Sequence, residues 1–106
     1  MINITDLSEC EVLLPGDWRR KDTLEIYSFT AEKMELKDGM LFRQLLIRDG
    51  VRPARELLYA LIIKGDYCGV RAGDKEFIIE EIVKRADRSY MRWADESSTK
   101  IEFSAA

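Results

Sequence analysis

The stretch LLPGDWRRKDTLEIYSF, residues 13–29, places Gly16 and Trp18 directly before an alternating apolar run. The segment TLEIYSF in this stretch has the length and the alternation of apolar and polar residues that are typical of a strand. We therefore expect a strand to follow a Gly-x-Trp element, and the rest of the chain decides what surrounds that strand.

Short turn-type clusters recur along the chain and divide it into pieces of strand length. Asp and Gly are common in tight turns because Gly tolerates positive φ and Asp hydrogen-bonds the nearby backbone. The clusters are KDG (37–39), RDG (48–50), KGD (64–66), AGD (72–74), ADRS (86–89) and ADESS (94–98). The segments between them have about four to nine residues, the usual length of strands. This spacing predicts an all-β antiparallel meander that forms a small β-barrel.

Two segments also fit a helix. In RPARELLYALII, Pro53 stands where a helix can begin, and EFIIEEIVKRA has apolar residues at 78, 79, 82, 83 and 86, which also fit a period of 3.6 residues. If either segment is helical, the fold is α+β, with a helix near 53–63 or 77–86. We favour strands at both places because turn clusters lie only a few residues away.

Three segments show strand-like alternation, the first being KMEL (33–36), which places Met34 and Leu36 on one face. YMRWA places Met91 and Trp93 on one face and Arg92 on the other, and TKIEF places Ile101 and Phe103 on one face. We expect these three segments to be half-buried.

The size and charge of the chain limit the function classes. Its 106 residues fit a single domain, 1–106, and 17 basic against 20 acidic residues give a net charge of −3. This charge provides no general attraction to nucleic acid or to an anionic membrane. The sequence has no apolar run of membrane-spanning length and no signal-peptide pattern at its start. We expect a cytoplasmic protein, or an exported one if a signal segment has been removed.

Several kinds of chemistry are disfavoured. The chain has no histidine, which removes the commonest general base and metal ligand. Cys10 and Cys68 lack metal-site spacing, and we favour two free thiols over one bridge. The turn carboxylates are better explained by turn formation than by acid–base pairing. We therefore expect no cofactor, no metal and no enzymatic activity.

Two basic clusters, residues 18–21 and 83–93, combine Arg and Lys with aromatic residues, the mixture that contacts phosphates and bases. The acidic total and the acidic residues just before the second cluster favour a solvated face, so we regard nucleic acid binding as unlikely. A third cluster, Arg43, Arg48, Arg52 and Arg55, serves either an anionic partner or none.

Gly16, Trp18 and the meander together resemble the small bacterial lipocalin-like (calycin) domains. In that family the tryptophan plugs one end of the barrel, the glycine allows a close backbone approach, and a basic side chain from a late strand packs over the indole. The resemblance implies that Arg92 or Arg88 has this last role. The chain is shorter than a typical lipocalin and lacks a clear second motif, so we expect a truncated or flattened barrel.

The resemblance and the aromatic residues lead to two hypotheses of function. The first is a non-catalytic binding domain for a small apolar or amphipathic ligand. Its candidate ligand residues come from different predicted strands and are Phe29, Phe42, Tyr59, Tyr67, Phe77 and Trp93. The alternative is a protein-interaction module that uses an exposed sheet face or edge, including a homodimer. Because a short chain needs its large side chains for its own core, we expect a filled interior.

Overall fold

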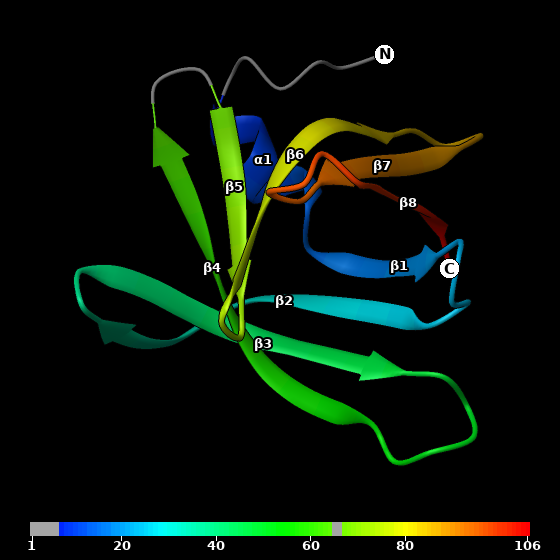
Figure 1. The fold of residues 1–106 in the computed structure, drawn as a ribbon, viewed down its shortest axis with the longest axis horizontal. Coiled ribbons are helices and arrows are strands. Elements are labelled where there is room, and N and C mark those ends of the chain that lie inside the picture. Colours follow the sequence, from blue (N-terminus) through cyan, green and yellow to red (C-terminus); the bar gives the residue numbers. More distant parts are fainter. Residues whose placement is uncertain (1–6, 65–66) are drawn as a thin grey trace.

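The structure is a computed structural model that describes residues 7–64 and 67–106. A short helix precedes eight strands, which close into a barrel in sequence order (Figure 1). The elements are α1 (Leu7–Leu13), β1 (Gly16–Arg20), β2 (Ile26–Lys37), β3 (Met40–Arg48), β4 (Arg55–Lys64), β5 (Tyr67–Ala72), β6 (Lys75–Lys84), β7 (Ser89–Ala94) and β8 (Lys100–Ala105).

Every strand pairs antiparallel with the next one, and β1 pairs with β8 to close the barrel, with Trp18 opposite Ala105. The prediction of an all-β antiparallel meander that forms a small barrel is therefore confirmed. Both ambiguous segments are strands, β4 and β6, so the α+β alternative is wrong.

A β-bulge explains why the apolar residues of β6 have a helix-like spacing in the sequence. The pairing of β6 with β7 shifts register between Ile79 and Glu81. Such a bulge inserts one extra residue and changes which residues face inward. Ile79 and Ile82, three positions apart, are therefore both buried, at 3% and 0% exposure. A bulged strand thus has the apolar spacing of a helix.

The interior of the barrel is filled by side chains. Phe29 packs edge-on against Tyr59 with ring centroids 5.1 Å apart, and Trp93 lies 5.8 Å from Phe29 and 4.7 Å from Phe103. Met91 is fully buried in the same cluster. Burial of apolar area and the tilted or edge-to-face ring contacts stabilise the fold.

Helix α1 and the segment after it close one end of the barrel. Cys10 and Leu14 have no exposed surface, and α1 contacts β5 and β6. Cys10 and Cys68 are both buried free thiols. A hydrogen bond with Cys68 and burial raise the pKa of the Cys10 thiol, which keeps it protonated.

Trp18 and Lys84 hold the closing segment in place. The Trp18 indole N–H donates a hydrogen bond of 2.8 Å to the carbonyl of Leu14, and the Lys84 ammonium donates one of 2.7 Å to that of Pro15. The Lys84 Nζ also lies 5.9 Å from the Trp18 ring centroid, within range of a cation–π interaction.

The basic residue over Trp18 is thus Lys84, and the prediction of Arg92 or Arg88 is wrong. Arg92 alternates with the inward-facing Met91 and Trp93, so it points outward and donates a hydrogen bond to Glu80 at 3.2 Å. Arg88 lies over the ring of Tyr90.

Gly16 is predicted to be intolerant of a side chain. Its φ is +129°, and an added Cβ would lie 3.2 Å from the Lys84 Nζ. Gly39 also has positive φ, +78°, but an added Cβ there has no neighbour within 4 Å. We expect Gly16→Ala to lower the free energy of unfolding by about 1–3 kcal/mol, measured by urea denaturation, and Gly39→Ala to lower it less. Equal losses in the two variants would contradict a role for close approach at Gly16.

Candidate functional site

A cleft of about 340 Å³ opens at the end of the barrel opposite α1. The meander places the β1–β2, β3–β4, β5–β6 and β7–β8 hairpins at this end. We call the cleft, lined by residues from these hairpins and by the interior side chains beneath them, the mouth cleft. Two hollows of about 290 and 410 Å³ adjoin it and share lining residues with it.

The floor of the mouth cleft is apolar and aromatic. Phe77 lies over Trp93 with ring centroids 5.3 Å apart, and Ile101 and Phe103 complete this side of the floor. Leu57 of β4 contributes from the opposite wall. Such a floor suits the apolar part of a small molecule.

Trp93 carries a buried donor without a partner. The residue is 2% exposed, and its indole N–H forms no hydrogen bond with any described group. A buried N–H that lacks an acceptor costs about 1–3 kcal/mol. Because Trp93 lines the mouth cleft, an acceptor atom on a bound molecule is one way to satisfy this donor.

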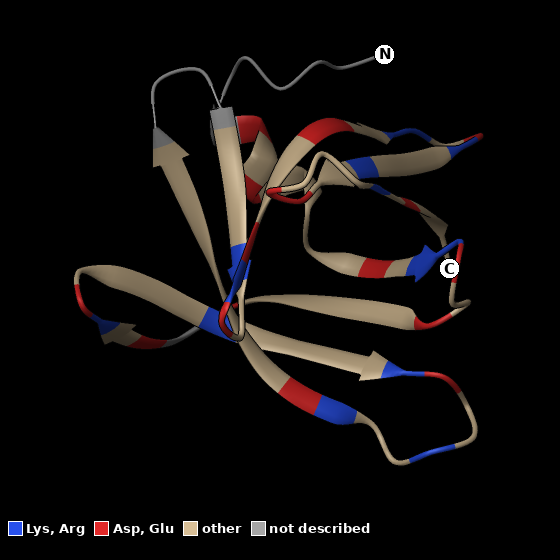
Figure 2. Ribbon diagram, viewed as in Figure 1, with Lys and Arg blue, Asp and Glu red and all other residues tan. Residues whose placement is uncertain are grey.

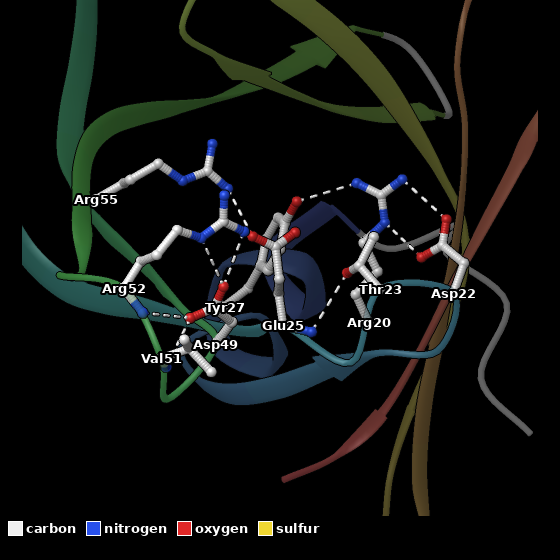
Figure 3. A network of polar contacts seen from close by, with 9 residues as sticks. All are labelled: Arg20, Asp22, Thr23, Glu25, Tyr27, Asp49, Val51, Arg52 and Arg55. Carbon is white, nitrogen blue, oxygen red and sulfur yellow. Dashed lines mark hydrogen bonds and ion pairs between the residues drawn. The ribbon is translucent and has the colours of Figure 1, made fainter.

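Polar side chains form the rim of the cleft (Figure 3). Arg20 donates two hydrogen bonds to the Asp22 carboxylate, at 2.6 and 3.0 Å, and a third to the Tyr27 hydroxyl at 3.1 Å. Its hydrogen bond with Asp22 raises the pKa of Arg20 and lowers the pKa of that carboxyl. The guanidinium is therefore held in one position at the edge of the apolar floor.

The opposite side of the rim is formed by the β3–β4 hairpin and Glu25. Arg55 donates a hydrogen bond of 2.7 Å to Glu25. Arg52 pairs with Asp49 at 2.9 Å, and Asp49 also accepts hydrogen bonds from the backbone N–H groups of Val51 and Arg52 (Figure 3). These bonds order the hairpin next to the cleft.

The charges that line the mouth cleft are mainly positive. Arg20, Arg55 and Lys75 contribute three positive charges and Glu25 one negative charge. Lys75 forms no ion pair with any described residue. The lining therefore favours a ligand group with negative charge, although the whole chain is acidic.

The structure separates the aromatic residues that the sequence grouped together. Phe77 and Trp93 line the mouth cleft, while Phe29 and Tyr59 lie deeper, packed edge-on in the filled interior. The side chain of Tyr67 lies outside the described part of the structure.

Phe42 does not point into the barrel, which corrects the prediction for that residue. Arg43, Leu45 and Ile47 are the buried positions of β3, so Phe42 lies on the outer face. Apolar residues stand on both faces of this strand, so their pattern does not indicate which face points into the barrel. The inward position next to Phe42 is taken by a charged residue, Arg43.

Several residues of the mouth cleft escaped the sequence analysis. Tyr27 lies two residues before Phe29 on β2, and Arg20 lies two residues after Trp18 on β1. Residues two apart on a strand share a face, so this alternation could have placed both side chains on the inner face. Lys75 and Arg55 carried no such signal, because their place at the rim depends on how the barrel closes.

The other chemical candidates remain separate. No group of three or more potential metal ligands occurs within residues 7–64 and 67–106, and in the same ranges no helix is long and apolar enough to span a membrane. The four arginines of the third basic cluster lie in three different places. Arg52 and Arg55 stand at the mouth of the barrel. Arg48 lies 3.7 Å from Asp17, and Arg43 is buried.

Comparison with models of protein families, with curated proteins and with solved structures found no match to this chain.

The rim predicts a pH-dependent loop. Hydrogen bonds from the backbone of Arg52 and Val51, and from the Arg52 side chain, hold the pKa of Asp49 well below its ordinary value. A lowered carboxyl pKa stabilises the folded loop above the unfolded pKa of about 3.9, and this contribution is lost as the pH falls through the folded pKa. We expect the amide resonances of Val51 and Arg52 to stay constant down to about pH 4 and to shift only at lower pH. In Asp49→Asn this acid transition should be absent; titration of Asp49 at or above its ordinary pKa would contradict the arrangement.

Proposed function

We propose that the protein is a non-catalytic, lipocalin-like binding domain that holds a small amphipathic ligand in the mouth cleft. The observation that carries the proposal is the combination of two features of the mouth cleft: an aromatic floor, where the Trp93 N–H has no partner among the described groups, and a lining with three cationic side chains and one anionic side chain. The apolar part of the ligand lies on the floor, and its anionic end lies at the rim.

The size of the cleft sets the size of the ligand. At about 340 Å³, the mouth cleft is at the lower end of the range of about 300–1,000 Å³ that is usual for small-molecule sites. The interior below it is filled by Phe29, Tyr59 and Met91. A ligand therefore sits above the core and does not run through the barrel, so a short or single-ring molecule fits better than a long chain.

The polar end of the ligand is assigned to Lys75 and Arg55. Lys75 has no ion-pair partner among the described residues, and Arg55, whose side chain is 61% exposed, uses one of its nitrogens for Glu25. Both therefore retain donors for a carboxylate or sulfonate. Arg20 has a smaller part, because its three hydrogen bonds already bind Asp22 and Tyr27.

The closed end supports the lipocalin-like part of the proposal. Gly16 with positive φ, Trp18 buried at 1% exposure, and Lys84 over its ring give the arrangement that the resemblance implies for a lipocalin-like barrel. This likeness rests on the barrel and on these three residues.

A fluorescence titration tests the proposed function. The probe is anilinonaphthalene sulfonate, which has apolar rings and one anionic group. We expect saturable one-to-one binding, and quenching of the fluorescence of the buried tryptophans as the probe settles near Trp93. Lys75→Glu replaces a rim cation by an anion and should weaken binding about tenfold, which corresponds to about 1.4 kcal/mol.

Lys37→Glu is the matched control, because Lys37 is an exposed lysine beside the β2–β3 turn at the other end of the barrel. It makes the same charge change and should leave binding unchanged. Equal weakening by both substitutions would show that only the net charge matters, and unsaturable binding to the original chain would refute a defined site.

A further inference from the structure

The barrel wall splits between β3 and β4 near its closed end. These strands pair from Ile47↔Arg55 to Phe42↔Ala60. Beyond that point β3 continues beside β2 to Met40, and β4 continues beside β5 to Lys64. In Figure 1 the end of β4 and the start of β5 lie away from the β2–β3 hairpin.

A groove of about 470 Å³ lies in this split. We call it the side groove; its lining consists of Glu11, Gly39, Met40, Leu41, Arg43, Leu61, Ile62 and Ile63. Leu41 and Ile63 are 41% and 45% exposed, which is high for large apolar side chains.

Within the described residues, both walls of the side groove carry strand edges whose backbone groups toward the groove have no strand partner. In an antiparallel sheet a residue directs its N–H and C=O to the same side, and consecutive residues alternate. Among Leu61, Ile62 and Ile63, at least one residue therefore presents both groups toward the groove, where β3 no longer pairs. An open edge of this kind is a template for another strand.

The composition of this edge contrasts with that of another free edge in the protein. β2 extends past Phe29, where its pairing with β1 ends, and Glu32, Glu35 and Lys37 lie on this extension. Its pairing with β3 also shifts register twice there. Charges and bulges are devices that block strand addition, whereas Leu61, Ile62 and Ile63 carry no charge (Figure 2).

Arg43 adds a second, independent sign of a ligand. It is 7% exposed, it forms an ion pair with Glu11 of α1, and its Nε–H has no partner among the described groups. Burial lowers the pKa of this guanidinium, but hydrogen bonds with Glu11 and Tyr59 more than offset that effect. Arg43 and Glu11 balance each other in charge, so the groove as a whole is neutral and retains a buried donor.

We propose that the side groove binds an extended, uncharged peptide segment of a partner protein, which adds as a strand between β3 and β4. Its backbone pairs with the free edge of β4, its apolar side chains contact Leu41 and Ile63, and one of its carbonyls accepts from the Arg43 Nε–H. The part of this edge that lines the groove spans three residues, 61–63, or roughly 10 Å at 3.3 Å per residue, so the bound segment is short.

The neutral charge of the groove also argues against the β2 extension of a second copy as the occupant. That extension is another free edge of the chain, and it carries several charges. Burying these charges in the neutral, apolar groove has a desolvation cost that an uncharged segment does not have. The site is separate from the mouth cleft and does not depend on the function proposed above.

Peptide binding to the whole chain tests this proposal. The probe is a fluorescently labelled peptide, acetyl-Thr-Val-Ser-Val-Thr-amide, followed by fluorescence anisotropy. We expect saturable binding, together with increased protection of the amides of Leu61–Ile63 from hydrogen exchange. Methylation of the backbone nitrogens of both valines keeps the side chains but removes two donors, and it should abolish binding.

Ile63→Lys places a charge on the edge and should weaken binding at least about tenfold. Ile78→Lys is the matched control, because Ile78 is 44% exposed on β6 and does not line the groove. Circular dichroism verifies that both variants fold. The proposal is overturned by absence of binding up to about 1 mM, by equal weakening in the two variants, or by full binding of the methylated peptide. A dimer that Ile63→Lys dissociates would also overturn it, because the groove would then take a second copy.

Discussion

The fold depends on the closure of one end of the barrel by Trp18 and Lys84. Their donors, on β1 and at the end of β6, both bind carbonyls of the segment 13–15. The hydrogen bond of Trp18 is buried, and it is costly to lose because the Leu14 carbonyl would remain without a partner. This closure ties α1 to the strands and leaves the opposite end, with its four hairpins, as the place where a cleft can form.

The sequence was sufficient for the strand order and insufficient for the details that depend on phase. Asp and Gly turns and the alternation of Met91, Arg92 and Trp93 follow from local physics, so the meander was predictable. The bulge after Ile79 and the inward position of Arg43 depend on cross-strand register. For that reason Phe42 and the basic residue over Trp18 were placed incorrectly.

Helix α1 was not predicted, and it has little local support. Its seven residues are fewer than an isolated helix needs in water, so its stability comes from the packing of Cys10 and of Leu14, just beyond its end, on the barrel. For the mouth cleft, the sequence indicated Phe77 and Trp93 but not the rim. Lys75 and Arg55 come from different hairpins, and only barrel closure brings them to one opening.

Among the described residues, two buried N–H groups without partners lie beside two different hollows. That of Trp93 belongs to the mouth cleft, with its aromatic floor and mainly cationic lining, and that of Arg43 belongs to the neutral side groove between two strand edges. The two hollows differ in the charge of their lining residues, and the side groove also lies between strand edges. They therefore suit different occupants, a small anionic amphipath at the mouth and an extended peptide at the side.

The most direct test of a ligand at the mouth, above a filled core, is the position of the bound molecule. Intermolecular nuclear Overhauser effects between anilinonaphthalene sulfonate and the methyl groups of the protein give this position in solution. We expect contacts with Ile47, Leu57 and Ile101, which line the mouth cleft. Contacts with Ile82 and Met91, which are fully buried in the core, would show that the interior opens to admit the ligand and would contradict a filled barrel with a binding mouth.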